Sequence, residues 1–403
     1  MPDILGQGEE RQPGPWPRRL AAIAALLLVA GVIVVHLPRH AHSTHAAVVR
    51  RPPATLSPAT LPPAPRPATG VAAVPDGVTG PTLPWDGNVR LPVTGPRPAW
   101  FWPSTGRTQV IGGLPPDDSG YQFIGVPGGW AVQAGPAAQP RCSGCAGPPR
   151  PVYFLGAQAR SVTRVGVADA VAPGAVPGTV WLTSYPPDVE PGTASGTAQE
   201  VSVAGKPLGP QVTLPPGDAI EQATDRGLLL VPAVQRSGPP VSMLWDVTGS
   251  RPSRTFSGVI AASANAIAWA PACDPVCRVQ VLDLATGRRT IVTLPGSAAN
   301  AAFSPDGDLL AVELSFYNGG DDGALATQLD VASVASGRLT VVPGTWASSD
   351  ALVGFGWLAD GESLIAELSF TTKVQVTSWR PGQARLAVAA VRPGQDSDSL
   401  VLG

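Results

Sequence analysis

One hairpin design limits what this chain can fold into more than any other feature of its sequence. Residues 300–314 read Asn-Ala-Ala-Phe-Ser-Pro-Asp-Gly-Asp-Leu-Leu-Ala-Val-Glu-Leu, two apolar stretches around a Pro-Asp-Gly turn. Pro305 presets its own φ, Asp306 can bond to its own backbone, and Gly307 accepts the positive φ that closes the hairpin. The design returns at residues 356–368, around Asp360-Gly361. A β unit that recurs at this period is typical of radial repetition, which predicts an all-β protein, a β-propeller.

Two alternating series of hairpin turns run from about residue 97 onward. The first series has turns at residues 126–129, 177–178, 225–227, 265, 306–307 and 360–361. Asn265 stands where the others carry Gly, and we expect it there because Asn tolerates the left-handed conformation. The second series has turns at residues 104–107, 205–206, 248–250, 286–288, 336–338 and 381–383, with a weaker member at 156–159.

Two hairpins per period make a four-stranded blade, so the two series predict six or seven blades, and we favour seven. Seven blades require residues 76–95 to complete one blade together with the C-terminal strands. Joining the first and last strands in this way removes the open edge that any sheet otherwise presents. The propeller domain is therefore assigned to residues 76–403.

The motif Phe303-Ser304-Pro305-Asp306-Gly307, followed by an apolar strand and by residues 331–338 with their Ser-Gly-Arg turn, resembles TolB-like and WD-type propeller repeats. The resemblance is strong over residues 277–368 and only thematic before them. The Asp-box of sialidases is absent, since no Asp-Gly turn is followed by Thr-Trp. The resemblance implies an exported propeller that binds other proteins or components of the cell envelope, although a fold by itself does not determine a function.

A membrane anchor is expected before the propeller. Leu20 to Leu37 is a run without charge in which His36 is the one polar interruption. As a helix it would span roughly 27 Å, close to the thickness of a bilayer core. Arg18 and Arg19 precede it and only Arg39 closely follows, which favours a cytoplasmic tail at residues 1–19 and an extracytoplasmic propeller.

A cleaved signal peptide is the alternative to this anchor, with the small residues Ala46-Ala47 as the cleavage site. Its apolar core would be longer than the roughly 7–15 residues usual in a signal, so we favour the uncleaved anchor. Residues 38–75 form a Pro-rich linker, expected to extend as polyproline II and to act as a semi-rigid spacer.

Several classes of chemistry are excluded by residue types. The four histidines, at residues 36, 40, 42 and 45, all precede the propeller, which excludes a Ser-His-Asp hydrolase and a His-ligated metal centre within it. The chain lacks a Gly-x-Ser-x-Gly elbow and a Gly-Lys-Ser/Thr phosphate loop. Residues 76–403 carry 20 basic and 26 acidic side chains, which argues against nucleic acid as a partner. We predict a non-catalytic protein without a cofactor or a metal.

Two local features shape loops of this propeller. Cys142 and Cys145 form one close pair, Cys273 and Cys277 another, and in an oxidising compartment each pair is expected to close as a disulfide. Residues 318–323, Asn-Gly-Gly-Asp-Asp-Gly, are rich in oxygen donors. They lack the spacing of an EF-hand loop, so a solvated turn is favoured over a calcium site, which stays open.

The predicted loop lengths differ between the two faces of the propeller. First-to-second and third-to-fourth strand turns share one face and are tight, whereas the other connections are long and varied. Binding residues usually lie on long loops, so a partner is expected there. Aromatic and acidic residues gather on these loops and predict a partner that presents basic or amide-rich groups: Asp117, Asp118, Tyr121, Asp188, Glu190, Tyr317, Asp321, Asp322 and Trp346.

The leading hypothesis is thus a membrane-anchored, extracytoplasmic propeller that binds a protein or an envelope polymer. One alternative is a propeller enzyme that acts on an envelope glycan by carboxylates alone. Against it, Asp306 and Asp360 lie in hairpin turns, where Asp commonly serves the turn itself. A second alternative is a sensor that signals through the N-terminal tail, although residues 1–17 are rich in Pro and Gly and lack a helical period.

Overall fold

The computed structural model describes residues 78 and 189 and eleven ranges. These are residues 82–95, 97–115, 120–135, 149–187, 192–233, 240–271, 277–317, 324–348, 351–358, 361–370 and 374–391. The chain divides into two units, Met1–Ala30 and Gly31–Gly403, and every described residue belongs to the second. The predicted tail, anchor and Pro-rich linker lie outside the described residues. Within the ranges above, no helix is long and apolar enough to cross a membrane.

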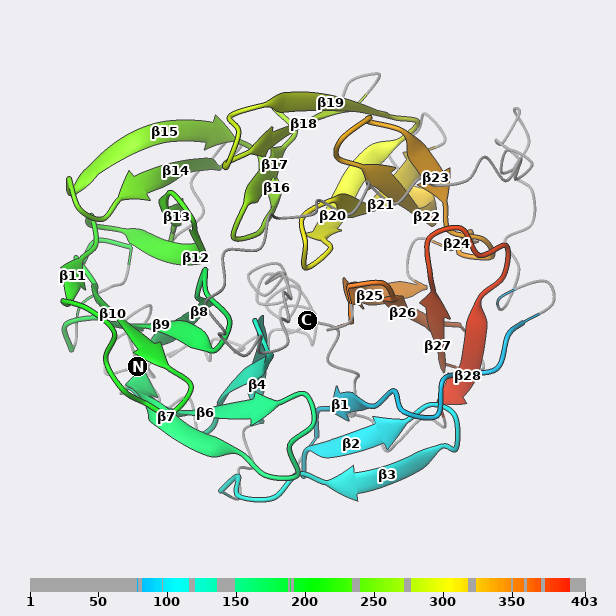
Figure 1. Ribbon diagram of the computed structural model, residues 1–403, viewed down its shortest axis with the longest axis horizontal. Helices are drawn as coiled ribbons and strands as arrows, with labels where there is room; N and C mark the ends of the chain where they lie inside the picture. The colour runs from blue at the N-terminus through cyan, green and yellow to red at the C-terminus, as the bar shows by residue number, and fades with distance from the viewer. Residues whose placement is uncertain are drawn as a thin grey trace, which may run out of the picture. The chain divides into compact units, whose positions relative to one another are not determined.

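The described residues form seven antiparallel sheets, which follow one another around a ring in chain order (Figure 1). The second unit is a seven-bladed β-propeller. Blade 1 comprises β1 (Leu91–Val93), β2 (Ala99–Trp102) and β3 (Arg107–Val110). Blade 2 comprises β4 (Gln122–Val126), β5 (Gly129–Gln133), β6 (Arg150–Gly156) and β7 (Thr163–Ala168). Blade 3 comprises β8 (Ala170–Pro173), β9 (Thr179–Ser184), β10 (Thr197–Ser202) and β11 (Val212–Thr213).

The remaining four blades follow the same order. Blade 4 comprises β12 (Asp218–Thr224), β13 (Gly227–Pro232), β14 (Val241–Asp246) and β15 (Arg251–Ser257). Blade 5 comprises β16 (Val259–Ala262), β17 (Ala266–Trp269), β18 (Cys277–Asp283) and β19 (Arg289–Leu294). Blade 6 comprises β20 (Ser297–Phe303), β21 (Leu309–Tyr317), β22 (Ala324–Ser333), β23 (Leu339–Val341) and β24 (Ala347–Ser348), which also pairs with β22. Blade 7 comprises β25 (Leu352–Trp357), β26 (Leu364–Ser369), β27 (Val374–Trp379) and β28 (Ala387–Val391).

The hairpin turns predicted from the sequence are confirmed. In blades 2 to 7 each turn of the first series joins the first strand to the second, and each turn of the second series joins the third strand to the fourth. The reason given for Asn265 was wrong, because Ser250 is the only described non-glycine residue with a positive φ. Asn265 instead donates its side-chain amide to the carbonyl of Asp306, 2.9 Å away in the next blade.

The core lies between the blades. Among the described residues, seven clusters of buried apolar side chains lie between neighbouring blades, one at each of the seven interfaces. The largest cluster lies between blades 5 and 6 and contains Phe303 and Leu310, whose side chains are fully buried. The last cluster joins Leu91 and Phe101 of blade 1 to Ile365 and Val376 of blade 7. Because every blade packs on both of its neighbours, the ring is closed.

The ring closes differently from the prediction. Blade 7 holds four strands of its own from residues 352–391, and β1 pairs with β2 instead of with a C-terminal strand. Among the described residues before β1, Val78 and Leu83 make isolated hydrogen bonds to blade 7, and the amide of Val78 donates to Gln375 Oε1 at 3.0 Å. The amide of Leu83 donates to the carbonyl of Leu386 at 2.7 Å, and Leu83 forms an isolated parallel bridge with Ala387.

The two faces of the propeller are built differently. We call the face with the first-to-second and third-to-fourth strand turns the tight-turn face, and the opposite one the long-loop face. On the tight-turn face, hydrogen bonds link turns of neighbouring blades, among them Gly178 N to Pro127 O at 3.1 Å and Asp225 N to Ala264 O at 2.7 Å. The polar groups of this face therefore serve in part to join blades.

Candidate functional site

A group of polar residues lies at the strand ends of blades 2, 3 and 4 on the long-loop face. We call it the long-loop cluster, and it consists of Gln122, Gln133, Arg150, Asp169, Tyr185 and Asp218. Four of these are the first or last residues of their strands, and the other two directly precede β8 and follow β9. Strand ends at this face bring together residues almost a hundred positions apart in the sequence.

Arg150 is the cationic member of the long-loop cluster. One of its terminal nitrogens donates to the side-chain oxygens of Gln122 and Gln133, each at 3.0 Å. Gln133 is 1% exposed and donates its own amide to the carbonyl of Ala168 at 3.1 Å. Both acceptors are neutral amides, so these bonds orient the guanidinium without cancelling its charge.

Asp169 and Tyr185 form the second half of the long-loop cluster. The Asp169 carboxylate accepts the backbone N–H of Tyr185 at 2.8 Å. Burial raises the pKa of Asp169, against the opposing effects of the Tyr185 hydrogen bond and of the Arg150 charge. The Tyr185 hydroxyl donates to the carbonyl of Asp218 at 3.3 Å. Burial, followed by the charges of Asp169 and Asp218, raises the pKa of that hydroxyl, so it stays protonated as a donor.

This arrangement suits recognition of polar groups. Arg150, Asp169 and Tyr185 are all half-buried, so each keeps part of its surface toward solvent. A guanidinium held by amides can bind a carbonyl or a carboxylate, while a carboxylate beside it can bind an amide N–H or an ammonium group. Both kinds of group occur together on a peptide or on an amide-bearing polymer.

Only part of the predicted binding set can be placed. Tyr121 directly precedes Gln122 and donates its hydroxyl to the carbonyl of Pro115 within the connection from β3 to β4. Trp346 packs on Phe316, with ring centroids 5.1 Å apart. Of Tyr317 only the backbone is described, as the last residue of β21. The other predicted residues lie outside the described part of the chain: Asp117, Asp118, Asp188, Glu190, Asp321 and Asp322.

None of the six members of the long-loop cluster was predicted from the sequence, because the predicted binding residues were acids and aromatics within the loops themselves. A polar residue at a strand end would have indicated them, such as Gln122 at the start of Gln-Phe-Ile-Gly-Val or Arg150 at the start of β6. Such residues lie where long connections enter and leave the sheet.

The predicted disulfides and the calcium loop stay predictions. Cys277 begins β18 and is 2% exposed, while Cys142, Cys145 and Cys273 lie outside the described residues, as do residues 318–323. Among the residues that the structure describes, no group of three or more His, Cys, Asp or Glu side chains is placed to hold a metal ion.

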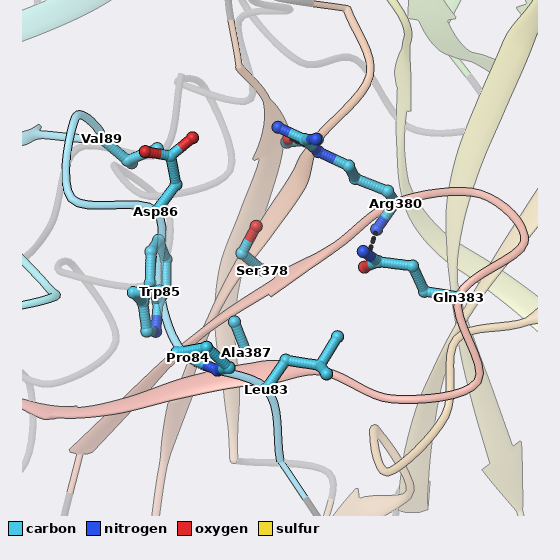
Figure 2. A pocket seen from close by; sticks show the side chains of 10 residues that line it. Leu83, Pro84, Trp85, Asp86, Val89, Ser378, Arg380, Gln383 and Ala387 are labelled. Carbon is cyan, nitrogen blue, oxygen red and sulfur yellow. Dashed lines mark hydrogen bonds between the residues drawn. The ribbon is translucent and has the colours of Figure 1, made fainter.

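A hollow of about 300 Å³ lies on the tight-turn face, where residues 83–89 meet the β27–β28 hairpin (Figure 2). Its walls include Trp85, Asp86, Ser378 and Arg380. Arg380 donates its Nε to Ser363 Oγ at 3.1 Å, and its backbone N–H to Gln383 Oε1 at 3.1 Å. In Figure 2 the Arg380 guanidinium faces the side of the hollow from which Asp86 projects. The hollow marks the seam where the ring closes.

Comparison with known proteins finds similar solved structures but no matching family model and no matching curated protein. Among solved structures, TolB from Acinetobacter baumannii is similar, with 12% identity, a TM-score of 0.41, and coverage of 75% of this chain and 78% of that one. A putative TolB from Agrobacterium tumefaciens is similar with 13% identity, a TM-score of 0.36, and coverage of 76% and 90%. At such low identity these likenesses concern the fold alone.

Proposed function

We propose that this protein is a membrane-anchored, extracytoplasmic propeller that binds a protein or a cell-envelope component on its long-loop face, without catalysis. The observation that carries the proposal is the long-loop cluster, in which Arg150, Asp169 and Tyr185 lie half-buried across neighbouring blades. The tight-turn face, by contrast, uses its backbone groups to link turns of adjacent blades.

The chemistry of this face indicates the kind of partner. The predicted loop residues are aromatic and acidic, and the long-loop cluster adds the guanidinium of Arg150 and the carboxylates of Asp169 and Asp218. A partner with basic or amide-rich groups complements this mixture, as a peptide or an amide-bearing envelope polymer would. Because exposed charges act mainly on association, salt should weaken the complex.

The anchor belongs to the same proposal. Leu20 to Leu37 is long and apolar enough to span a bilayer core, and Arg18 and Arg19 favour its N-terminal side as the cytoplasmic one. The Pro-rich residues 38–75 then hold the propeller away from the membrane surface. This part rests on the sequence alone.

The experiment is a pull-down from a cell-envelope fraction with the full-length chain, extracted from membranes with detergent. Reversing the charges of Asp321 and Asp322 should weaken capture roughly tenfold, and raising salt should weaken it by a similar factor. Asp169→Asn should also weaken capture, because Asn keeps an acceptor for the Tyr185 N–H but loses the charge.

The matched control reverses the charges of Asp308 and Glu362, which lie at tight turns between β20 and β21 and between β25 and β26. Capture should be unchanged by these variants. Loss of capture in this control, or recovery of the full-length chain in the soluble fraction, would contradict the proposal. Hydrolysis of an envelope glycan by the purified chain, abolished by Asp169→Asn, would point to the carboxylate enzyme instead.

A further inference from the structure

The hollow on the tight-turn face is separate from the long-loop cluster and has the features of a binding site of its own. Its volume of about 300 Å³ lies at the lower end of the range for small-molecule sites in proteins. Its lining comes from two parts of the chain that are far apart in the sequence, residues 83–89 before β1 and residues 363–387 of blade 7. The hollow therefore forms only where the two ends of the propeller meet.

Two small side chains leave this space open. Ser378 on β27 lies opposite Ala387 on β28 in the antiparallel register. Opposite residues of paired strands point to the same face of a sheet, so these two side chains lie next to each other on the wall of the hollow. A larger side chain at either position would fill it.

Trp85 forms another wall of the hollow. It packs against the apolar cluster between blades 1 and 7 and remains partly exposed. Arginine guanidinium groups lie over the rings of Trp100 and Trp269, whereas none of the described residues stacks on Trp85 in this way. Figure 2 shows the Trp85 ring along one side of the hollow, across from Gln383. A rigid apolar surface is thus available to a ligand.

Hydrogen-bonding groups of both kinds border the same hollow. One carboxylate oxygen of Asp86 accepts the N–H of Asn88 at 2.9 Å, which leaves the other oxygen as an acceptor for a ligand. Gln383 accepts the backbone N–H of Arg380 with its side-chain oxygen at 3.1 Å, so its side-chain NH₂ group can donate to a ligand. The Arg380 guanidinium is held through its Nε by Ser363 Oγ at 3.1 Å. In Figure 2 these polar groups surround one end of the hollow, and Leu83, Pro84 and Ala387 the other.

We infer that the hollow binds a sugar in its pyranose form. The faces of a pyranose ring carry C–H groups that pack on an indole, and its rim carries hydroxyl groups that both donate and accept hydrogen bonds. Trp85 offers the indole, Asp86 an acceptor and Gln383 a donor. An apolar ligand would displace water from these polar groups without replacing its hydrogen bonds. A simple anion would meet the carboxylate of Asp86, and a simple cation the guanidinium of Arg380, so both fit the hollow less well.

Ligand-detected NMR on the full-length protein, solubilised in a detergent without a sugar headgroup, tests the inference. Glucose, galactose and N-acetylglucosamine are titrated separately, and sorbitol, which carries hydroxyl groups but no ring, is the control ligand. At least one of the three pyranoses should bind with a Kd on the order of 1 mM, as a ligand of that size does in a small open site. Sorbitol should not bind. Binding of none of the pyranoses, or equal binding of sorbitol, would overturn the inference.

Variants of the hollow test where the sugar binds. Ser378→Leu should fill the hollow and weaken sugar binding roughly tenfold, while the melting temperature of the protein stays unchanged. Trp85→Ala should weaken binding by a similar factor, and Trp85→Phe should retain part of it, because Phe keeps an aromatic face. Trp346→Ala, in the predicted binding set of the long-loop face, is the matched control and should leave sugar binding unchanged. Sugar binding that survives both Ser378→Leu and Trp85→Ala would place the sugar elsewhere and overturn the inference.

The sugar site and the proposed function fail separately. Binding at millimolar concentration does not survive the washes of a pull-down, so Ser378→Leu should leave capture of the envelope partner unchanged. Reversing the charges of Asp321 and Asp322 should weaken that capture but leave sugar binding unchanged. Loss of sugar binding in the charge-reversed variant would place the sugar on the long-loop face and overturn the inference.

Discussion

Asp330 shows how strongly one buried side chain can couple this fold to pH. Its carboxyl lies in β22, is 1% exposed, and accepts a hydrogen bond from the side-chain amide of Gln328. Burial raises the pKa of Asp330 to about 6, although the Gln328 bond favours the charged form. A raised pKa means that the folded state binds the proton more tightly than the unfolded chain does. Stability therefore falls as pH rises from about 4 to about 6 and is constant above that range.

Asp330→Asn should remove this penalty. At pH 7.5 we expect the variant to be more stable by up to about 3 kcal/mol, since each unit of pKa difference corresponds to about 1.4 kcal/mol. The gain should disappear near pH 4, where Asp330 is already protonated. Urea unfolding of the propeller at the two pH values measures both quantities.

Asp246→Asn is the control at the residue scale. Hydrogen bonds from the backbone N–H groups of Gly249 and Thr248 lower the pKa of Asp246, so its charged form is the favoured one. The Asn variant should gain no stability at pH 7.5. A gain there equal to that of Asp330→Asn would mean that burial of Asp330 is not the cause.

At the scale of the element, the Thr/Ser-Gly-Arg turn of residues 286–288 and 336–338 separates backbone strain from packing. Gly287 and Gly337 have nearly the same φ, 71° and 68°. A Cβ on Gly287 would meet nothing within 4 Å, whereas a Cβ on Gly337 would lie 2.6 Å from the carbonyl oxygen of Ile291 in the preceding blade. The glycine of this turn therefore has open space around it in blade 5, whereas in blade 6 it packs against the backbone of the preceding blade.

Alanine at these two positions should have unequal effects. Gly287→Ala should cost about 1 kcal/mol, the penalty of a left-handed conformation. Gly337→Ala should cost about 3 kcal/mol, because the backbone must also move away from Ile291. Chemical denaturation of both variants measures the difference in unfolding free energy. Equal losses of stability would show that the backbone around Ile291 can move away from the new Cβ without an energetic penalty.

At the scale of the whole molecule, one interface of the ring is smaller than the others. Among the described residues, the cluster between blades 1 and 7 holds four buried side chains, Leu91, Phe101, Ile365 and Val376, the fewest of the seven clusters. Burial of apolar area is the main favourable term in packing blades together. The ring should therefore open first between blades 1 and 7, before it unfolds as a whole.

Phe101→Ala and Phe303→Ala test this expectation. Each truncation removes a buried ring, which typically costs about 3–5 kcal/mol of stability. We expect Phe101→Ala to raise hydrogen exchange in blades 1 and 7 alone, and Phe303→Ala, in the largest cluster, to lower the melting temperature of the whole propeller. An equal fall in melting temperature for both variants would contradict a local opening.

The sequence by itself determined the class of fold and limited the number of blades to six or seven, with seven favoured. Turns such as Pro305-Asp306-Gly307 close hairpins through their own φ preferences, so their spacing can be recognised without knowledge of any distant contact. The predicted turns of both series are found where the sequence places them, and two hairpins per blade give seven sheets. The tail, anchor, linker and most of the predicted binding residues lie outside what the structure describes and stay predictions.

Tertiary structure alone decided how the ring closes and where polar groups meet. The sequence assigned residues 76–95 to the last blade, but β1 pairs with β2, because register depends on packing between blades rather than on local preference. Asn265 looked like a left-handed turn residue, yet its amide reaches Asp306 in the next blade. Likewise Gln122, Arg150 and Tyr185 carry no motif, and they meet only because the propeller gathers distant strand ends on one face.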